Sequence, residues 1–348
     1  MGLLLRVPSD GYATEPRHAC PVCGSGDSRF AFVKYGDPYH VCRACRSLFL
    51  QKQPTPAKVE KCFAEVGASS QVPQLHRFGL ADMPVHWKKY FATLQQGLKS
   101  DGKKHLDVGS GAGECLLASS LLGHEVLGID VGKTAVEAVQ AEFQLEVRQT
   151  TLEEAGFLPS TWDMVTLNAV LEHVINPRSV LREAARVLRP GGVMAVLVPT
   201  TEFLGWHLLR WPWYSVHSGH LQYFSRQGLF RLMRDFGVEP YASSTEGKGL
   251  KGNQMARDVL RTDLAWNFFA LRTWCFARGW ACPEPISWFS NPRRVTEDPR
   301  LDMRRRCDKL VFRTRLFWDI LGYPLHKLSV VLDRQQNLVV FGVKACAE

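Results

Sequence analysis

The sequence has no long hydrophobic run, and this absence limits how the chain can be placed in a cell. Its 348 residues contain no stretch of about 18 consecutive apolar residues, the length that a membrane-spanning helix needs. The most apolar long segment, residues 264–282, is interrupted by Arg272 and Arg278. The opening residues MGLLLR lack the apolar core and cleavage site of a secretory signal. We therefore expect a cytoplasmic protein with no transmembrane segment.

The sequence also lacks the G-x-G-x-x-G fingerprint that a dinucleotide-binding loop carries after its first strand. In its place Gly109, Gly111 and Gly113 occupy alternate positions in HLDVGSGAGECLLASSLLG, and Asp107 precedes them. A pyrophosphate approaching this loop would be repelled by the carboxylate, whereas a ligand with a positive centre would be attracted to it. The loop therefore predicts a cofactor other than NAD.

From residue 104 onward, predicted strands alternate with predicted helices. The expected strands are residues 105–108, 125–130, 161–170, 193–199 and 336–345, and the expected helices are residues 83–99, 114–123, 133–144 and 178–188. This alternation predicts an α/β fold with a doubly wound, Rossmann-like sheet that is mostly parallel. Ligands of such sheets bind beyond the carboxyl ends of the strands, which is where the glycine loop falls.

Four segments together resemble one enzyme family. They are the acid-x-Gly-x-Gly-x-Gly pattern at 107–113, TWDMVTLNAVLEHVINP at 161–177, LREAARVLRPGGVMAVLVP at 181–199 and HLQYFSRQGLFRLMRDFGVEPY at 220–241. Their order and spacing over residues 104–244 are similar to those of class I S-adenosylmethionine-dependent methyltransferases. The resemblance implies a methyltransferase core that binds S-adenosylmethionine.

The resemblance also implies which residues hold this cofactor. The glycine loop, with Ser110, would wrap the methionine part, and Asp107 would lie near its ammonium group. Asp130, which ends the second predicted strand, would accept hydrogen bonds from the ribose hydroxyls. Leu152 and Glu153 stand where the family places the adenine ring.

Candidate catalytic residues follow the later strands. Methyl transfer from a sulfonium is an in-line displacement, and a base helps when the acceptor carries a proton. Glu172 and His173 follow one predicted strand, where His173 is a base or the pair organises the rim of the site. His217 and His220 follow the next strand and are further candidates. Asn168 is assigned to the cofactor side as a residue that organises the backbone. No Asn/Asp-Pro-Pro-Tyr sequence follows it, which argues against methylation of an adenine or glutamine nitrogen.

Four of the ten cysteines form two Cys-x-x-Cys pairs near the N-terminus. Cys20 and Cys23 are separated by 18 residues from Cys42 and Cys45, and the segment between them is expected to form a hairpin. This spacing predicts a zinc ribbon, in preference to a redox dithiol or an iron–sulfur centre. Four thiolates leave no open coordination position, so the expected zinc is structural.

The net charge of +9 is concentrated near the C-terminus, where residues 248–334 contain 17 Lys or Arg against 9 Asp or Glu. We expect a helical insertion there. It is either a cap with a solvated basic face or a surface for an anionic acceptor, nucleic acid or an anionic membrane. The aromatic-rich run at 205–217 is either a lid or a pocket wall for an apolar or ring-bearing acceptor.

The chain is therefore divided into four parts. These are a zinc-ribbon segment at 1–60, the methyltransferase core at 61–247, the basic insertion at 248–335 and the final core strand at 336–348. The leading hypothesis is a methyltransferase for a small-molecule, carrier-, lipid- or sugar-linked acceptor, with O-methylation favoured. One alternative is an RNA methyltransferase that uses the ribbon and the insertion. Another is a non-catalytic protein that binds S-adenosylmethionine and a partner.

Overall fold

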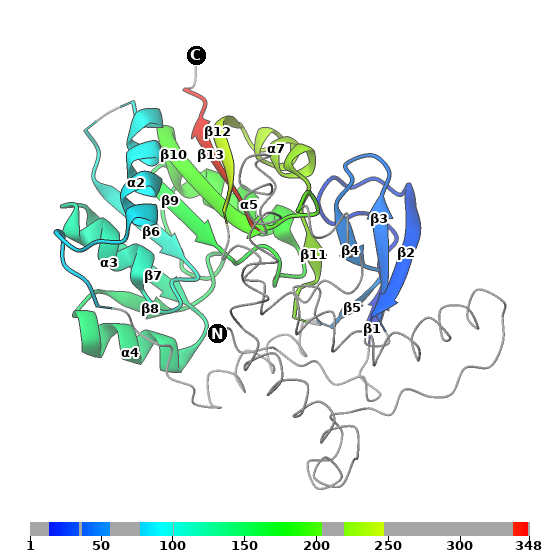
Figure 1. The fold of residues 1–348 in the computed structure, drawn as a ribbon, viewed down its shortest axis with the longest axis horizontal. Coiled ribbons are helices and arrows are strands. Elements are labelled where there is room, and N and C mark those ends of the chain that lie inside the picture. Colours follow the sequence, from blue (N-terminus) through cyan, green and yellow to red (C-terminus); the bar gives the residue numbers. More distant parts are fainter. Residues whose placement is uncertain are drawn as a thin grey trace, which may run out of the picture.

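The structure is a computed structural model. It describes residues 14–34, 37–55, 77–99, 101–203, 219–246 and 337–346. These residues form a seven-stranded sheet, a four-stranded sheet and a two-stranded sheet (Figure 1). The aromatic run at 205–217, which includes His217, and the whole of the expected basic insertion lie outside the described residues.

The seven-stranded sheet has the order β12-β13-β10-β9-β6-β7-β8. Its strands are β6 (Lys104–Val108), β7 (Glu125–Asp130), β8 (Val147–Gln149), β9 (Trp162–Asn168), β10 (Leu188–Pro199), β12 (Val238–Glu246) and β13 (Asn337–Lys344). The five strands from β8 to β10 are parallel, and β13 runs antiparallel to both β10 and β12. The predicted α/β sheet is confirmed, and residues 337–344 supply one of its strands.

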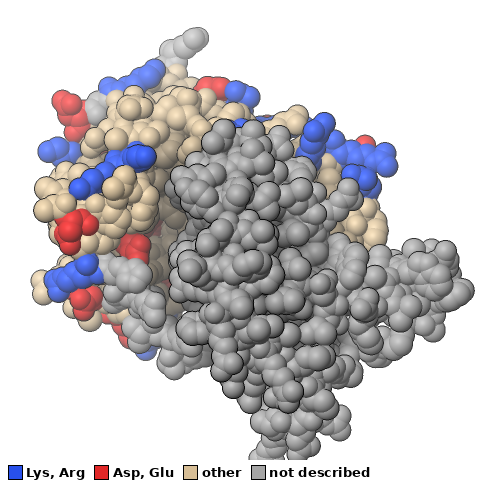
Figure 2. All heavy atoms as spheres, in the orientation of Figure 1, with Lys and Arg blue, Asp and Glu red and all other residues tan. Residues whose placement is uncertain are grey.

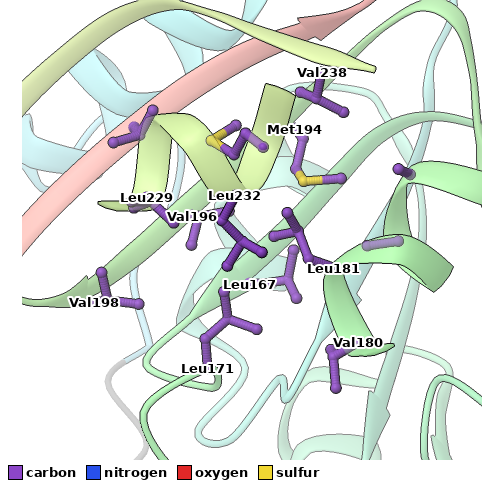
Figure 3. Close-up of a cluster of buried hydrophobic side chains, with 14 of the residues drawn as sticks. Leu167, Leu171, Val180, Leu181, Met194, Val196, Val198, Leu229, Leu232 and Val238 are labelled. Atoms are coloured by element: carbon purple, nitrogen blue, oxygen red, sulfur yellow. The ribbon is translucent and has the colours of Figure 1, made fainter. Parts of the chain in front are cut away.

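Successive side chains along a strand of this sheet point alternately toward two layers of helices. On β10, Val193 and Ala195 belong to one apolar cluster, while Met194, Val196 and Val198 belong to another. This period of two is expected of a strand that is buried on both faces. Figure 3 shows the second cluster, in which side chains of β10 meet those of two helices.

Helices cover both faces of the sheet. The helices are α2 (Val85–Gly97), α3 (Glu114–Leu121), α4 (Lys133–Phe143), α5 (Pro177–Val187) and α7 (Arg226–Arg234). α2 and α3 contribute to the cluster of Val193, whereas α5 and α7 contribute to the cluster of Met194. The chain therefore has the doubly wound, three-layer arrangement that the sequence predicts.

The start of α5 is determined by residues that are adjacent in the sequence. The Asn176 side chain accepts a hydrogen bond from the backbone N–H of Ser179, and Pro177 occupies the first turn, where its missing N–H costs nothing. β10, by contrast, begins at Leu188, five residues earlier than predicted at 193. Leu188 pairs with Trp162 across a register shift, so part of the expected turn belongs to the strand.

The N-terminal segment is continuous with the core. β2 (Ser28–Lys34) and β3 (Asp37–Cys42) form the predicted hairpin, and β4 (Leu48–Leu50) extends it. β11 (Gln222–Tyr223), which lies between β10 and α7 in the chain, pairs with β4 and completes the four-stranded sheet. β1 (Thr14–Pro16) and β5 (Lys52–Pro54) pair beside it.

The described surface carries mixed charge. Figure 2 shows Lys and Arg interleaved with Asp and Glu over the side of the molecule formed by α2, α3 and α4. No helix within the described ranges is long and apolar enough to cross a membrane.

The core gives a direct test of this packing. Leu232 on α7 is fully buried against β10 and α5, so Leu232→Ala should lower the free energy of unfolding by about 2–5 kcal/mol. Urea denaturation followed by circular dichroism measures the change. The control is Leu158→Ala, because Leu158 is 74% exposed and its truncation should change stability by less than about 0.5 kcal/mol. Equal effects of the two changes would contradict the packing described here.

Candidate functional site

The glycine loop after β6 has a shape that only small residues permit. Gly109 has φ +68°, and a Cβ there would lie 2.5 Å from Cγ2 of Val170. Gly113, the N-cap residue of α3, has φ +72°, and a Cβ there would lie 2.9 Å from Val139. Left-handed backbone and lack of space together require glycine at both positions. The loop therefore exposes backbone at the carboxyl end of β6, where a ligand can approach it closely.

Asp130 ties this loop to the end of β7. Its Oδ2 accepts a hydrogen bond from the N–H of Gly111 at 2.9 Å, and its Oδ1 accepts one from the N–H of Gly132 at 2.7 Å. A carboxylate in this position sets the height of the glycine loop and presents its remaining lone pairs at the edge of the sheet. Asp130 thus lies at the end of β7, beside the glycine loop.

Asp107 lies inside the sheet edge, with only 1% of its surface exposed. Its Oδ1 accepts a hydrogen bond from the Thr166 hydroxyl at 2.6 Å. Burial raises the pKa of the Asp107 carboxyl to about 7, and the hydrogen bond from Thr166 opposes that rise. A positively charged ligand group would favour the ionised form and return the pKa toward its ordinary value.

Two polar atoms near the loop have no hydrogen-bond partner among the described residues. They are Oγ of Ser110 and Nδ2 of Asn168, and both atoms are buried. The other end of the Asn168 amide, Oδ1, accepts a hydrogen bond from Tyr90 at 2.9 Å, which fixes the side chain. Because unsatisfied buried polar atoms are costly, both positions fit a bound polar ligand.

The two residues expected near an adenine ring have different environments. Leu152 is 2% exposed and belongs to the main apolar cluster, whereas Glu153 is exposed. Both residues follow β8. The backbone N–H of Thr150 donates a hydrogen bond to the backbone carbonyl oxygen of Asp130 at 3.1 Å, so this segment lies beside the end of β7. Leu152 is placed to give an apolar wall.

A second group of side chains forms a rim beyond β9. His173 and His220 approach edge to face with ring centroids 4.8 Å apart, and His220 lies 5.5 Å from the ring of Tyr223. Nε2 of His173 is 4.0 Å from Oε1 of Glu172. The structure therefore brings together three of the four candidate catalytic residues that the sequence singled out. We call this group, Glu172, His173 and His220, the rim cluster.

Glu172 and His173 are both uncharged near neutral pH in the absence of ligand. Burial raises the pKa of the Glu172 carboxyl to about 8 and lowers the pKa of the His173 imidazole. Both shifts favour the neutral forms, so the short Glu172–His173 separation is not an ion pair near neutral pH. Nδ1 of His173 is 2.7 Å from the carbonyl oxygen of Gly219, which can only accept, so Nδ1 carries the proton and Nε2 has a free lone pair.

The four paired cysteines converge as the sequence predicts. All four are buried, and their sulfur atoms lie within 4.8 Å of one another. The Sγ atoms of Cys20 and Cys45 are 3.7 Å apart, and those of Cys23 and Cys42 are 3.6 Å apart. Sulfurs placed tetrahedrally about 2.3 Å from one ion are separated by about 3.8 Å. The donor set and its spacing fit zinc.

The cysteine-bearing segment docks onto the rim through specific hydrogen bonds. The Leu50 N–H donates to the carbonyl of Leu221 at 2.9 Å, and the Leu221 N–H donates to the carbonyl of Glu172 at 2.7 Å. On α7, the Ser225 hydroxyl donates to the carbonyl of Cys45. On α5, Arg178 donates to the carbonyl of Val22 at 3.0 Å.

Two buried side chains that the sequence did not single out strengthen this junction. The amide nitrogen of Gln222 donates to the carbonyls of Leu171 and Val174, on either side of Glu172 and His173. Arg17 donates to Oε1 of Gln222 at 3.1 Å and to the carbonyl of Ile175 at 2.8 Å. Neither residue belongs to a recognisable motif, because the Arg17 contacts span 205 and 158 positions and the Gln222 contacts span 51 and 48 positions.

Comparison with known proteins agrees with this geometry. Residues 80–243 match the model of a family described as a methyltransferase domain. A ubiquinone biosynthesis O-methyltransferase of Pseudomonas putida (strain GB-1) is 42% identical over 129 residues, which are 35% of this chain and 52% of that protein. One of Aliivibrio fischeri (strain ATCC 700601 / ES114) is 42% identical over 99 residues, which are 26% of this chain and 42% of that protein. The chain thus spans about half the length of the curated relatives it matches.

A solved structure described as a SAM dependent methyltransferase from Archaeoglobus fulgidus superposes with a TM-score of 0.45 and 14% identity, covering 75% of this chain and 92% of that chain. The family match includes the glycine loop, Asp130 and the rim cluster. It does not include the cysteine-bearing segment that packs against the rim cluster. Residues 80–243 of this chain are therefore similar to a methyltransferase domain, and they contain the five parallel strands of the sheet described above.

Proposed function

We propose that the protein transfers a methyl group from S-adenosylmethionine to an oxygen atom of a small biosynthetic acceptor. The observation that carries this proposal is the arrangement of two sites at one sheet edge. The cofactor loop with Asp107 and Asp130 lies at the ends of β6 and β7, and the rim cluster follows β9. The first site would bind a nucleoside that carries positive charge, and the second would offer a base.

The proposed cofactor site uses the chain's own polar groups in distinct roles. Asp130 binds the ribose hydroxyls while holding the glycine loop through Gly111, and Asp107 receives the ammonium group. Ser110 and Asn168 supply two buried polar atoms that have no hydrogen-bond partner among the described residues. When bound, S-adenosylmethionine supplies an electrophilic methyl group on a sulfonium.

His173 is the proposed general base. Its Nε2 carries the free lone pair, because Nδ1 donates to Gly219, and burial keeps the imidazole neutral by lowering its pKa. A neutral Nε2 can take the proton of an acceptor hydroxyl as the oxygen attacks the methyl carbon. Glu172, protonated near neutral pH through its raised pKa, is placed to hold the acceptor or the imidazole, and His220 packs on the His173 ring.

The acceptor class is inferred from the relatives and from the rim. The matched relatives are named as O-methyltransferases of ubiquinone biosynthesis, and the methyltransferase-domain match over residues 80–243 includes the rim cluster. An apolar, ring-bearing acceptor with a hydroxyl group suits the buried aromatic surroundings of His220 and Tyr223.

The ribbon is proposed to hold one structural zinc through Cys20, Cys23, Cys42 and Cys45. The zinc would close the two knuckles, and its coordination would stabilise a segment whose own apolar core is small. Because β4 pairs with β11 next to the rim cluster, this zinc would also hold the rim in place.

Cofactor binding is tested at Asp130. Asp130→Ala removes the acceptor of the ribose hydrogen bonds and frees Gly111, so S-adenosylmethionine affinity measured by calorimetry should fall by about 1–3 kcal/mol. Glu125→Ala is the matched control, since this carboxylate is exposed at the opposite end of β7 and should leave affinity unchanged. Tight binding of NAD with no binding of S-adenosylmethionine would refute the cofactor assignment.

The base is tested at His173. His173→Ala should lower kcat/KM for a phenolic acceptor by about 10²–10⁴-fold and leave the affinity for S-adenosylmethionine unchanged. Burial lowers the His173 pKa, so the wild-type imidazole stays neutral at pH 7. We therefore expect kcat/KM to decrease only when the pH is below the ordinary histidine pKa of about 6.5. His86→Ala, an exposed histidine at the start of α2, is the control. Full activity of His173→Ala would contradict this role and would indicate that alignment of the acceptor with the methyl group is sufficient for catalysis.

The zinc is tested by metal analysis of protein purified without chelator, which should contain about one zinc per chain. Cys42→Ser should lose the zinc and lower acceptor turnover through the β4–β11 junction, while S-adenosylmethionine affinity is retained. Cys346→Ser alters an exposed free cysteine and should change neither property. Wild-type protein without zinc, or a zinc-free variant with full turnover, would contradict the assignment.

A further inference from the structure

A row of polar side chains crosses the interior beneath the glycine loop. His105 and Asp107 alternate along β6 and so face the same side, and Thr166 is the partner of Asp107 on β9. His105, Asp107 and Thr166 are 0%, 1% and 0% exposed. The layer that covers them is otherwise apolar, with the ring of Phe91 packed edge to face on His105 at 5.8 Å.

The row is joined by short hydrogen bonds that lead from the surface to Asp107. His124 Nδ1 lies 3.0 Å from the Ser119 hydroxyl, and this hydroxyl lies 2.7 Å from Nδ1 of His105. Nε2 of His105 lies 2.8 Å from the Thr166 hydroxyl, which lies 2.6 Å from Oδ1 of Asp107. His124 is half-buried at the end of α3, and the other four side chains are buried.

The chemistry of these groups fixes the direction of every bond when Asp107 is ionised. The carboxylate can only accept, so the single proton of Thr166 points to it, and the Thr166 oxygen accepts from Nε2–H of His105. Burial lowers the pKa of His105 to about 3, so the ring is neutral and its Nδ1 accepts from Ser119. The Ser119 oxygen then accepts from Nδ1–H of His124.

We propose that His105, Thr166 and Ser119 are positioning residues of the cofactor site, and that their directed chain of hydrogen bonds holds Asp107 ionised and aimed at the ammonium group of the cofactor. Without the chain, burial alone would leave a neutral carboxyl, which has no charge to offer a cation. A protonated Asp107 would accept the hydrogen bond from Thr166 more weakly, because its oxygen would then carry no charge. The chain therefore favours the ionised form of Asp107.

Other groups around the row act on Asp107 in known directions. Asp130 raises the Asp107 pKa through its charge, and Cys115, a buried thiol 3.8 Å from the Thr166 oxygen, hydrogen-bonds to Asp107 and lowers it. At the far end, His124 lowers the His105 pKa, and Lys103 lowers that of His124. These neighbours set the size of the effect, whereas the Thr166 hydroxyl is the direct donor to the carboxylate.

The inference rests on the proposed cofactor site, and the test separates the two. Binding of S-adenosylhomocysteine, which carries the same ammonium group, is measured by calorimetry between pH 5.5 and 8.5. Wild-type affinity should fall as the pH drops through the region near 7, where unliganded Asp107 takes up a proton. Thr166→Val keeps the shape but removes the donor, so the pH midpoint should move up by about one unit or more and affinity at pH 7 should fall roughly fivefold or more.

Matched variants and a second ligand give the controls. Thr166→Ser retains the hydroxyl and should restore the wild-type profile. Ser119→Ala breaks the chain two bonds away from Asp107 and should shift the midpoint in the same direction by less. 5′-Methylthioadenosine keeps the adenine and ribose but lacks the amino acid part, so its affinity should be the same in all variants and independent of pH.

Three results would overturn the inference. They are an unchanged pH midpoint in Thr166→Val and Ser119→Ala, an affinity loss of equal size at every pH, and an equal loss for 5′-methylthioadenosine, since the last two indicate a general distortion of the pocket. If wild-type protein bound no S-adenosylhomocysteine at any pH, the proposed cofactor site itself would be wrong. Melting temperatures of each variant confirm that it is folded before binding is compared.

Discussion

A buried carboxyl group must be neutral, paired with a cation or hydrogen-bonded to donors. Two such groups lie at the edge of the sheet where the glycine loop and the rim cluster are found. Asp107 and Glu172 are at most 2% exposed, and burial raises their pKa values to about 7 and about 8. A carboxyl that binds its proton more tightly when folded stabilises the fold below its unfolded pKa and loses that contribution as the pH rises through the folded value. Both groups therefore sit at some cost near neutral pH unless a ligand compensates.

The surroundings of the two carboxyls differ, and so do their roles. Asp107 accepts a hydrogen bond from the Thr166 hydroxyl and lies next to the glycine loop, which suits a carboxyl that becomes fully ionised when a cationic ligand binds. Glu172 has one carboxyl oxygen without a partner among the described residues and stands beside a neutral imidazole, which suits a group that keeps its proton. In the proposed function, this sheet edge would bind a cation at Asp107 and transfer a proton at the rim cluster.

The cysteine-bearing segment is part of this edge, although it lies far from it in the chain. β4 pairs with β11, and Gln222 of β11 donates to the carbonyls of Leu171 and Val174 around the rim cluster. Arg17 adds a further contact to Gln222, and burial lowers the pKa of its guanidinium to about 10. A metal that orders the knuckles therefore acts on the position of Glu172 and His173 as well as on its own segment.

The sequence by itself determined the features that depend on short-range chemistry. Alternating apolar runs specified the sheet, the glycines at 109 and 113 specified a loop that a Cβ would block, and two Cys-x-x-Cys pairs specified the knuckles. The tertiary structure alone decided the junction of ribbon and rim and the row from His124 to Asp107. Those contacts join strands and helices that are distant in the chain, and a histidine in a strand has no local pattern that reveals its partners. Hydrogen-bond direction, and with it the charge of Asp107, exists only once the chain is packed.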